Sequence, residues 1–417
     1  MKQYLCIDLK TFYASVECVE RGLDPFQTKL VVADPSRGKG AICLAVSPKM
    51  KQLGVKNRCR VYEIPSDLSY ITALPRMKLY MRYSAAIYGI YLNYISKEDI
   101  HVYSIDEAFL DVTNYLRYYQ MSARELAQRI VKDIYDTYGI TATVGIGTNL
   151  YLAKVALDIS AKHNHDHMAM LDEESYRATL WNHTPLSDFW MVSKGTINRL
   201  AQYNIHTMQD ITKANPKILY KEFGVNAEYL IDHAYGKEPT TIRDIKRYQP
   251  KHNSISNNQI LFENYHFDDA LLVLKEMVEL NVLTLIERHL VTNHISIHVG
   301  YGDHTTKSTT ASKKIKYTTN SLQILKKEFI DLFEAKVYHC CPIRSIGICF
   351  GNVKEEYYEA YDLFIDQKEI MEERKLQQTI VSIQHKYGKN AVLKGMNLLE
   401  KATAQKRNQL IGGHNAE

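Results

Sequence analysis

Three acidic residues lie where apolar segments of the chain end, and their types suit metal-dependent chemistry. Asp8 is near the end of the apolar run 3–9, and Asp106 and Glu107 separate two further apolar segments. Clustered carboxylates repel one another, and hard cations with oxygen ligands relieve that repulsion. Because two such ions are the usual device for in-line phosphoryl displacement, the three acids predict a phosphoryl-transfer site. Taken alone, either Asp106 or Glu107 is more simply explained as a turn residue.

The elements around these acids predict a mixed α/β domain. Apolar runs and helical periodicity predict strands at 3–9, 101–105, 108–112 and 141–147, and helices at 121–138 and 150–162. This order is the split βαβ pattern of ferredoxin-like folds. In such a sheet the first strand lies beside the hairpin, so we expect Asp8 to approach Asp106 and Glu107. Residues 31–70 interrupt the pattern as an insertion.

The remaining sequence predicts a helical segment and then a second copy of the same pattern. Residues 171–242 contain short helical stretches, and the polar, basic residues 243–256 suggest a linker. A β-α-β-β-α-β order follows, with predicted strands at 255–262, 294–300, 307–312 and 344–350, and helices at 267–288 and 319–334. Residues 354–417 are charged and helix-prone.

Composition excludes several classes of protein. The 417 residues suggest two to four domains, and 45% hydrophobic with 24% charged residues is ordinary globular usage. No apolar run is long enough for a membrane span, and the N-terminus lacks a signal-peptide core. The seven cysteines form no CxxC pair, so we expect a cytoplasmic chain with reduced thiols. A net charge of +5 permits a polyanionic partner without requiring one.

Two motifs carry a family resemblance. IDLKTFYASVE (7–17) and SIDEAFLDV (104–112) resemble the signature pair of Y-family translesion DNA polymerases, most closely the bacterial UmuC/UvrX-like branch. The resemblance spans nearly the whole chain. It implies a low-fidelity, template-directed DNA polymerase of the SOS response, a mutator that lacks proofreading. Primer-template DNA and dNTPs would be its substrates, and two Mg²⁺ ions would bind Asp8, Asp106, Glu107 and the Leu9 carbonyl.

The resemblance also implies a multidomain α+β architecture. A ferredoxin-like palm would be accompanied by small fingers, a helical thumb and a ferredoxin-like little finger that binds DNA. The implied boundaries are 1–10 and 71–170 for the palm, 11–70 for the fingers, 171–242 for the thumb, 243–353 for the little finger and 354–417 for the tail.

Nucleotide-binding residues follow from the same motifs. The backbone N–H groups of Thr11, Phe12 and Tyr13 open a helix and can cradle a triphosphate. In the family the aromatic ring at Tyr13 lies under the incoming sugar and excludes a 2′-hydroxyl.

Two lysines would contact the phosphates. Lys51 lies in the fingers segment 40–55, where the DinB-like branch has an Arg and the UmuC-like branch accepts a Lys. Lys162 follows Lys154 by eight residues, whereas the family spacing is seven. Lys154 itself is predicted to be structural or to lie near the metal site.

DNA-binding residues are predicted in two regions. Residues 185–200 resemble a helix-hairpin-helix entry, which grips phosphates through backbone N–H groups. Met191 and Ser193 replace its usual glycines, so phosphate binding there would be weaker or would depend on Lys194. A purely structural helix pair is the alternative. In the little finger the predicted DNA-binding residues are Arg243, Lys246, Arg247, Lys251, Lys313, Lys314 and Lys316.

A short segment after the little finger resembles the bacterial sliding-clamp motif. It comprises Tyr361, Asp362, Leu363 and Phe364, with Ala360 in place of the usual Gln. The alternative is a small apolar anchor of the tail onto its own body. The resemblance also raises a UmuD-like subunit and a recombinase filament as partners, and nucleoid association when the enzyme is engaged on DNA.

Two other functions remain open at this stage. A palm-type nucleotidyl cyclase shares the sheet and the acids, although a GGDEF-like hairpin is missing from the sequence. A catalytically silent DNA-binding or clamp-binding factor is the second, and the complete acidic triad argues against it.

Overall fold

The computed structural model describes residues 2–251, 253–303, 305–363 and 365–417. The chain divides into two compact units, residues 1–248 with 416–417, and residues 249–415. Each unit has its own sheet and its own apolar core.

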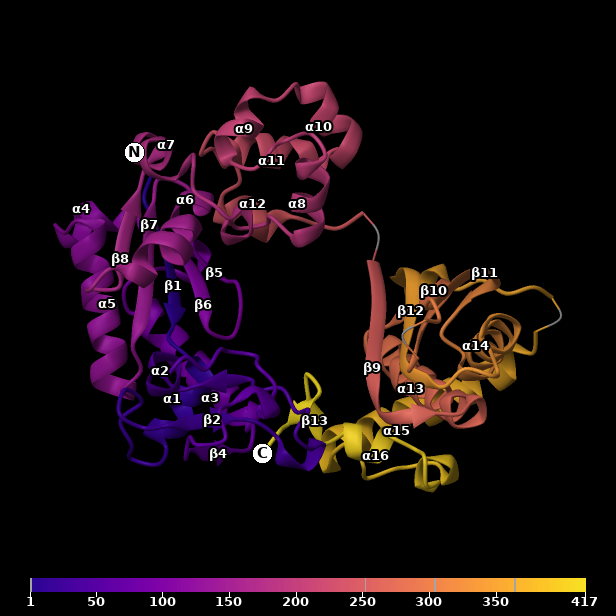
Figure 1. Ribbon diagram of the computed structural model, residues 1–417. Helices are drawn as coiled ribbons and strands as arrows, with labels where there is room; N and C mark the ends of the chain where they lie inside the picture. The colour runs from indigo at the N-terminus through magenta and orange to yellow at the C-terminus, as the bar shows by residue number, and fades with distance from the viewer. Residues whose placement is uncertain (1, 252, 304, 364) are drawn as a thin grey trace. The chain divides into compact units, whose positions relative to one another are not determined.

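The first unit is built on a five-stranded sheet with β1 at its centre (Figure 1). Its strands, in spatial order, are β5 (Ile100–Val102), β6 (Glu107–Asp111), β1 (Tyr4–Leu9), β7 (Ala142–Gly147) and β8 (Met168–Leu171). β1 runs antiparallel to both β6 and β7, and β8 adds in parallel to β7. Apart from the additional β8, this is the ferredoxin-like order, so the sequence prediction for this sheet is confirmed.

Helices cover both faces of this sheet. α5 (Ala123–Tyr138) packs on one face through Leu126, Ile130 and Ile134. Ser122 caps its N-terminus in a capping box with Glu125. α6 (Leu150–Val155) covers the other face, where it continues into a π turn, η4 (Ala156–Ser160), and a 3₁₀ turn, η5 (Ala161–His163). The other helices around the sheet are α1 (Phe12–Val19), α3 (Met77–Leu92) and α4 (Tyr115–Tyr119).

The predicted insertion forms a small sheet of its own. Its strands, in spatial order, are β3 (Ala45–Val46), β2 (Leu30–Val32) and β4 (Ile71–Ala73), with α2 (Pro48–Gln52) beside them. A compact apolar cluster that includes Val31, Cys43 and Met50 holds this sheet together.

A group of short helices completes the first unit. They are α7 (Glu173–Leu180), α8 (Lys194–Ala201), α9 (Met208–Lys213), α10 (Pro216–Phe223), α11 (Asn226–Ala234) and α12 (Ile242–Arg247). The prediction of a linker over 243–256 is therefore wrong in its first part. Thr241 accepts a hydrogen bond from the Asp244 backbone N–H and starts α12, whose Ile242 is buried in the core of the first unit.

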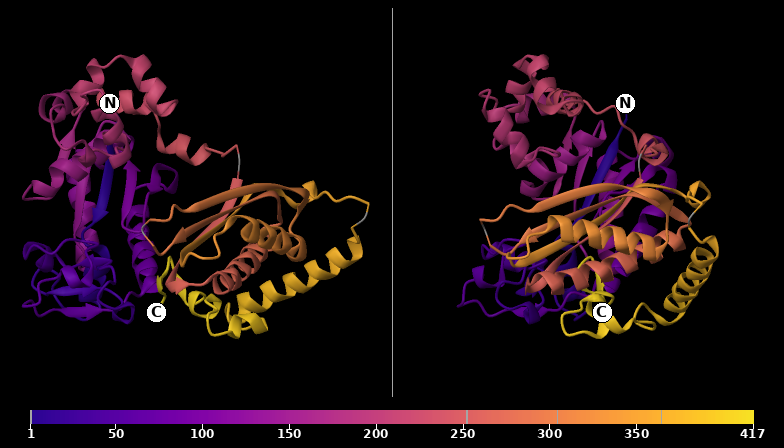
Figure 2. Two further views of the ribbon diagram at one scale, coloured as in Figure 1. Left: turned by 45° about the vertical axis from the view of Figure 1, so that its right-hand side comes forward. Right: turned by 90° about the vertical axis from the view of Figure 1, so that its right-hand side faces the viewer.

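The second unit has a four-stranded antiparallel sheet, backed on one face by two helices (Figure 2). The strands, in spatial order, are β11 (Thr309–Thr319), β10 (Leu290–Tyr301), β12 (Ile343–Glu355) and β9 (Asn253–Tyr265). The helices are α13 (Phe267–Glu287) and α14 (Leu322–Lys336). The predicted element order is confirmed, although β11 continues to Thr319 and α14 begins three residues later than predicted.

The ferredoxin-like topology predicted for this sheet is wrong. A ferredoxin-like sheet has its first strand inside, but β9 lies at the edge and pairs only with β12 among the described strands. The physical reason is composition. β9 is polar and largely exposed along its length, whereas β10 and β12 bury Ile295, Ile297, Ile346 and Ile348. A strand this polar is favoured at an edge rather than at the centre of a sheet.

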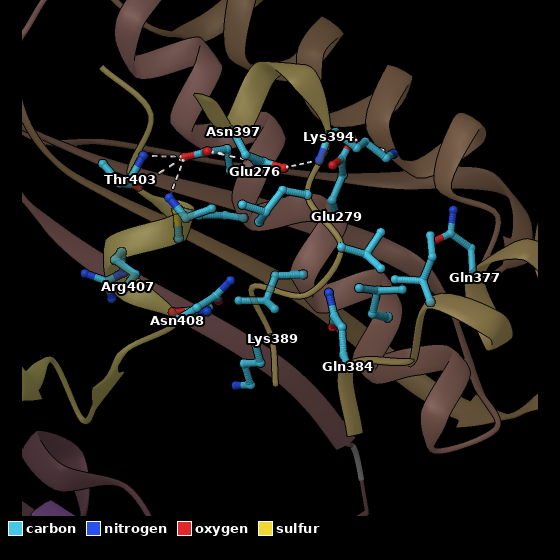
Figure 3. A pocket seen from close by; sticks show the side chains of 18 of the residues that line it. Glu276, Glu279, Gln377, Gln384, Lys389, Lys394, Asn397, Thr403, Arg407 and Asn408 are labelled. Atoms are coloured by element: carbon cyan, nitrogen blue, oxygen red, sulfur yellow. Dashed lines mark hydrogen bonds and ion pairs between the residues drawn. The ribbon is translucent and has the colours of Figure 1, made fainter. Parts of the chain in front are cut away.

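Much of the predicted tail is a folded part of the second unit. α15 (Gln367–Tyr387) packs against α13, and the chain then passes through α16 (Ala404–Arg407) to a small hairpin of β13 (Leu410–Ile411) and β14 (His414–Asn415). Figure 3 shows the buried Glu276 of α13 accepting hydrogen bonds from the backbone of Thr403 at 2.7 Å and from Asn397 at 2.9 Å. A cavity of about 90 Å³ lies between these segments, and its described lining includes none of the site residues predicted above.

Over the residues that the structure describes, no helix combines the length and the apolar character needed to cross a membrane.

Candidate active site

The pairing of β1 with β6 brings the three predicted acids to one end of the sheet. Asp8 and Glu107 are directly opposite each other in the antiparallel register, so their side chains share a face. The Leu9 backbone N–H donates to the Asp106 carbonyl at 2.9 Å. The turn before β6 is longer than predicted, because Tyr103 and Ser104 both donate backbone N–H groups to the Glu107 carbonyl. Glu107 is thus the first residue of a strand.

The Glu107 carboxylate is engaged by Lys154 of α6. The Lys154 ammonium lies 2.8 Å from Glu107 Oε1, and both side chains are about nine-tenths buried. The Cys6 thiol donates to the same oxygen at 3.1 Å. Burial alone would lower the pKa of Lys154, but the surrounding Cys6, Asp158 and Glu107 raise it above its ordinary value. Among the described residues, no three His, Cys, Asp or Glu side chains converge closely enough to hold a metal ion in this arrangement.

The pKa of Asp8 nevertheless shows the charge repulsion expected of clustered carboxylates. Burial, followed by the charges of Asp106 and Glu107, raises the pKa of Asp8 from 3.8 to about 7. A bound divalent cation would relieve this repulsion, and carboxylate and carbonyl oxygens are the ligands such cations prefer. By the chemistry of their donor atoms, Asp8, Asp106, Glu107 and the Leu9 carbonyl therefore fit a divalent metal.

Two glycines of β7 bring α6 unusually close to the sheet. An added Cβ at Gly145 would lie 2.0 Å from the Ala153 carbonyl oxygen, and one at Gly147 would lie 2.2 Å from the Ala153 nitrogen. Only glycine permits this approach. Because Lys154 follows Ala153, the same contact sets the position of the ammonium that reaches Glu107.

Three lysines, Lys10, Lys51 and Lys162, lie within electrostatic range of Asp8. Burial, and then the charge of Lys51, lower the pKa of Lys10 to about 8. Burial also lowers the pKa of Lys51, with Asp8 opposing this shift and Lys162 adding to it. Lysines that share a site in this way repel one another, and a polyanionic ligand would stabilise them. Lys51 and Lys162 were both predicted as phosphate contacts, and the structure brings them near the acids.

The π turn explains the eight-residue spacing of Lys154 and Lys162. Two α-helical turns span about seven residues, and a π turn closes each ring with one residue more. The turn η4 therefore absorbs the additional residue. Both lysines remain on one side and bond the same carboxylate, that of Asp158, each at 3.0 Å.

Tyr13 is held by a stack of aromatic rings and a buried polar network. Its ring stacks on that of Tyr80 at 4.5 Å, and the Tyr80 hydroxyl donates to Glu17 at 2.8 Å. Burial opposes ionisation of Glu17, but hydrogen bonds from Arg76, Arg21 and Tyr80 hold its pKa below the usual value. Burial raises the pKa of Tyr13, and the charge of Asp106 adds to this shift. The Tyr13 hydroxyl therefore lies within electrostatic range of Asp106.

The backbone is strained where the predicted triphosphate cradle begins. Thr11 has a φ of 46°, in the left-handed region that a β-branched residue rarely adopts. Its hydroxyl lies 3.0 Å from that of Ser15, and α1 begins at the next residue, Phe12. Strain of this kind is concentrated at ligand clamps and active sites.

The residues predicted to hold DNA in the first unit lie at helix ends. Ser193 caps α8 and accepts from the Thr196 backbone N–H at 3.2 Å, with Lys194 as the first helical residue. Met191 adopts a φ of 67°, so it keeps the conformation suited to the glycine it replaces. Arg243, Lys246 and Arg247 were predicted in the little finger, but they lie on α12, which belongs to the first unit.

In the second unit the predicted lysine run is divided between the two faces of the sheet. Lys313 pairs with Glu328 of α14 on the helix-covered face. Lys314 and Lys316 point to the open face, since side chains alternate along a strand. In the register, Lys314 lies opposite His294, and the open face also carries His298 and Ser296. Lys251 is exposed just before β9.

The predicted clamp segment contacts the second unit at its start and is exposed to solvent at Leu363. Ala360 pairs with Thr318 through two backbone hydrogen bonds, the Tyr361 hydroxyl lies 2.6 Å from that of Thr319, and Asp362 pairs with Lys316. Leu363 is 99% exposed, so this residue does not anchor the segment onto its own unit. Phe364 lies outside the described residues.

Sequence reasoning missed three residues near the site. Lys10 directly follows the motif residues Asp8 and Leu9, which was a usable signal. The charge of Arg58 acts on Tyr13, but no local pattern marks Arg58. Asp158 has a carboxylate shared by two lysines, and only its helical spacing to Lys154 hinted at this.

Comparison with known proteins decides the family. A family model described as the impB/mucB/samB family matches residues 7–158, and its C-terminal domain model matches residues 252–363. The chain belongs to the impB/mucB/samB family. Its matches include UvrX of Bacillus subtilis (strain 168), which is named as a UV-damage repair protein, at 30% identity over 99% of this chain and 97% of that protein.

Two further proteins are similar to this chain over most of its length. DNA polymerase IV 2 of Bacillus subtilis (strain 168) is 27% identical, with 99% of this chain and 98% of the relative covered. A solved Y-family DNA polymerase chimera of Dbh and Dpo4 shares the fold, with a TM-score of 0.63 at 21% identity over 85% of this chain and 99% of that one. The predicted resemblance to Y-family translesion polymerases is confirmed.

Proposed function

We propose that this chain extends a DNA primer past damaged template bases, by nucleotidyl transfer at the site formed by Asp8, Asp106 and Glu107. Family membership makes it a DNA-directed DNA polymerase of low fidelity. The observation that carries the assignment of the site is the arrangement of charge. Acids brought together by the pairing of β1 with β6 lie within electrostatic range of Lys10, Lys51 and Lys162. Such a site suits a metal-bound triphosphate.

Mg²⁺ is the proposed metal, with two ions held by Asp8, Asp106, Glu107 and the Leu9 carbonyl. When bound, the ions would supply charge neutralisation at the triphosphate and activation of the primer 3′-hydroxyl. The family supports a divalent cofactor, and the all-oxygen donor set favours a hard cation such as Mg²⁺.

The remaining residues would bind and orient the nucleotide. Backbone N–H groups at Thr11, Phe12 and Tyr13 would hold phosphate oxygens at the start of α1. Lys51 and Lys162 would contact phosphate as point charges. Catalysis would then consist of positioning together with electrostatic stabilisation of the charge that develops on the phosphate. The Tyr13 ring, fixed against Tyr80, would exclude a 2′-hydroxyl by steric contact.

The two units correspond to four proposed subdomains and a tail. We assign residues 1–10 and 71–170 to the palm, 11–70 to the fingers, 171–242 to the thumb, 249–353 to the little finger and 354–417 to the tail. The little finger starts at 249 rather than at the predicted 243, because α12 packs in the core of the first unit. The open face of the second sheet, with Lys314 and Lys316, would contact the DNA backbone, together with Lys194, Arg243, Lys246, Arg247 and Lys251. Lys313 and Lys316 would contribute less, because their charges are paired with Glu328 and Asp362 respectively.

The segment 361–364 would bind the sliding clamp through Leu363 and Phe364. Full exposure of Leu363 on an anchored segment supports this, since an apolar side chain held in water can be buried by a partner. A UmuD-like subunit and a recombinase filament are further proposed partners.

Primer extension tests the proposed site. The template is copied with and without an abasic site, by the wild-type chain, by Asp106→Ala and by Asp136→Ala as a matched control on the exposed surface of α5. We expect extension by the wild type and by Asp136→Ala, and loss of extension in Asp106→Ala. Full activity of Asp106→Ala would refute the proposed site, and a wild type that binds DNA without extending it would indicate a silent binding factor.

A further inference from the structure

Asp158 lies at the centre of a charged network that joins Glu107, Lys154 and Lys162 in the candidate active site. Its carboxylate lies 3.0 Å from the ammonium of Lys154 on one side and 3.0 Å from that of Lys162 on the other. Asp158 is itself 23% exposed, whereas Lys154 is nine-tenths buried. Among the described carboxylates, Asp158 and Glu107 are the two within ion-pair distance of the buried Lys154 ammonium.

The local backbone is built to hold Asp158 in this place. It lies within the π turn η4, between two lysines each four residues away. π turns are rare in helices overall, but those that occur are often found at functional sites. The close packing of α6 on Gly145 and Gly147 restrains the turn from the sheet side, because the Leu157 nitrogen would lie 2.4 Å from an added Cβ at Gly145.

Lys154 would compete with a bound metal for the Glu107 carboxylate. Its ammonium contacts both oxygens of Glu107, at 2.8 and 2.9 Å, while Cys6 also donates to that group and the Tyr103 ring lies 6.0 Å from the ammonium. A carboxylate bound in this way is less available as a metal ligand. A second counter-charge weakens the hold of Lys154 on Glu107, since the same ammonium divides its hydrogen bonds between them.

We propose that Asp158 is a positioning residue of the active site, which draws Lys154 away from Glu107 and so keeps Glu107 available to bind a divalent metal. The proposal rests on the proposed function, because it takes Glu107 as a metal ligand. Asp158 acts through Lys154, without contact to the metal. Loss of its charge leaves Glu107 as the sole carboxylate partner of the buried ammonium and weakens metal binding.

Titration with Mn²⁺ in the absence of DNA and nucleotide, with free Mn²⁺ measured by electron paramagnetic resonance, tests the proposal directly. Hydrogen bonds to charged groups are strong enough that we expect Asp158→Asn to weaken Mn²⁺ binding about tenfold. The control is Asp136→Asn, which breaks an exposed Lys132–Asp136 pair of the same spacing on α5 and leaves Mn²⁺ binding unchanged. Primer extension by Asp158→Asn requires more Mg²⁺ for half-saturation and recovers most of its rate at high Mg²⁺. Asp158→Glu restores Mn²⁺ binding in part.

A double-mutant cycle shows whether Asp158 acts through Lys154. In a Lys154→Gln background, which removes the ammonium and keeps a hydrogen-bonding side chain, Asp158→Asn has little further effect on Mn²⁺ binding. An equal loss in both backgrounds, or wild-type Mn²⁺ binding by Asp158→Asn, overturns the proposal. The variant Asp106→Ala tests the proposed metal site separately from the proposed role of Asp158. If it leaves Mn²⁺ binding intact, the proposed metal site fails and this proposal with it; if it abolishes binding while Asp158→Asn does not matter, this proposal fails alone.

Discussion

Replacement of Gly145 by alanine tests the packing that positions Lys154. The added Cβ would lie 2.0 Å from the Ala153 carbonyl oxygen and 2.4 Å from the Leu157 nitrogen. Non-bonded contacts are favourable only from about 3.5 Å, so α6 must move away from β7 by about 1 Å or more. Both obstructing atoms belong to the backbone and cannot rotate aside. Overpacking of this kind costs about 1–3 kcal/mol, and we expect Gly145→Ala to fall at the upper end.

Gly89 provides a matched control, because it lies within α3 and an added Cβ there would meet no described atom within 4 Å. Gly89→Ala is expected to stabilise the helix by about 1 kcal/mol. The two substitutions therefore have opposite signs although they add the same methyl group. Urea unfolding followed by tryptophan fluorescence measures both, since the two tryptophans of the chain, Trp181 and Trp190, belong to the first unit.

Activity provides a second readout of the same substitution. A displacement of about 1 Å at a catalytic group can cost roughly 10²-fold in rate, so Gly145→Ala should extend primers far more slowly under conditions in which it remains folded. Wild-type stability and rate in Gly145→Ala would refute the reasoning, because α6 could not then lie as close to β7 as described.

Four further results are expected. Tyr13→Ala should raise ribonucleotide incorporation, measured as the ratio of rNTP to dNTP insertion, and unchanged discrimination would exclude Tyr13 as the steric barrier. The raised pKa of Asp8 means that the folded state binds a proton more tightly than the unfolded state. The free energy of unfolding without metal should therefore fall as the pH rises from about 4 to about 7 and then level off. Asp8→Asn should remove this component of the pH dependence in EDTA, and an unaltered profile would contradict the burial and charge repulsion described. Met191→Gly should stabilise the first unit by about 1 kcal/mol, because glycine adopts a φ of 67° without strain, and a loss of stability in urea unfolding would argue against that conformation. Leu363→Ala should weaken capture of the chain on immobilised sliding clamp, whereas Leu399→Ala, also exposed, should not; equal capture of both would exclude Leu363 from the interface.

Much of the first unit follows from local sequence. The apolar run that ends at Asp8 and the helical spacing of Leu126, Ile130 and Ile134 are enough to predict β1 and α5, because each pattern matches the period of one structure. The two motifs around Asp8 and Asp106 also predict the family. These features are local, and no distant contact is needed to recognise them.

The second sheet was harder to predict, since strand order depends on which surfaces must be buried. The β-α-β-β-α-β order is common to several topologies, and the polar character of β9 was the signal for an edge position. A strand rich in Asn and Ser has few apolar side chains to bury against the helices, whereas β10 and β12 bury their isoleucines at the centre.

In the proposed active site, the sequence motifs predict which acidic and aromatic residues lie together. The residues that each of them contacts depend on the fold. Asp8, Asp106, Glu107 and Tyr13 were identified from motifs in which the chemistry and the spacing coincide. That Lys154 engages Glu107 and that Lys10 lies near Lys51 depend on contacts between residues far apart in the chain. The π turn that brings Lys154 and Lys162 to the same carboxylate is local, but no sequence pattern marked it. Such contacts arise because burial removes water and leaves each charge to find a partner within the fold.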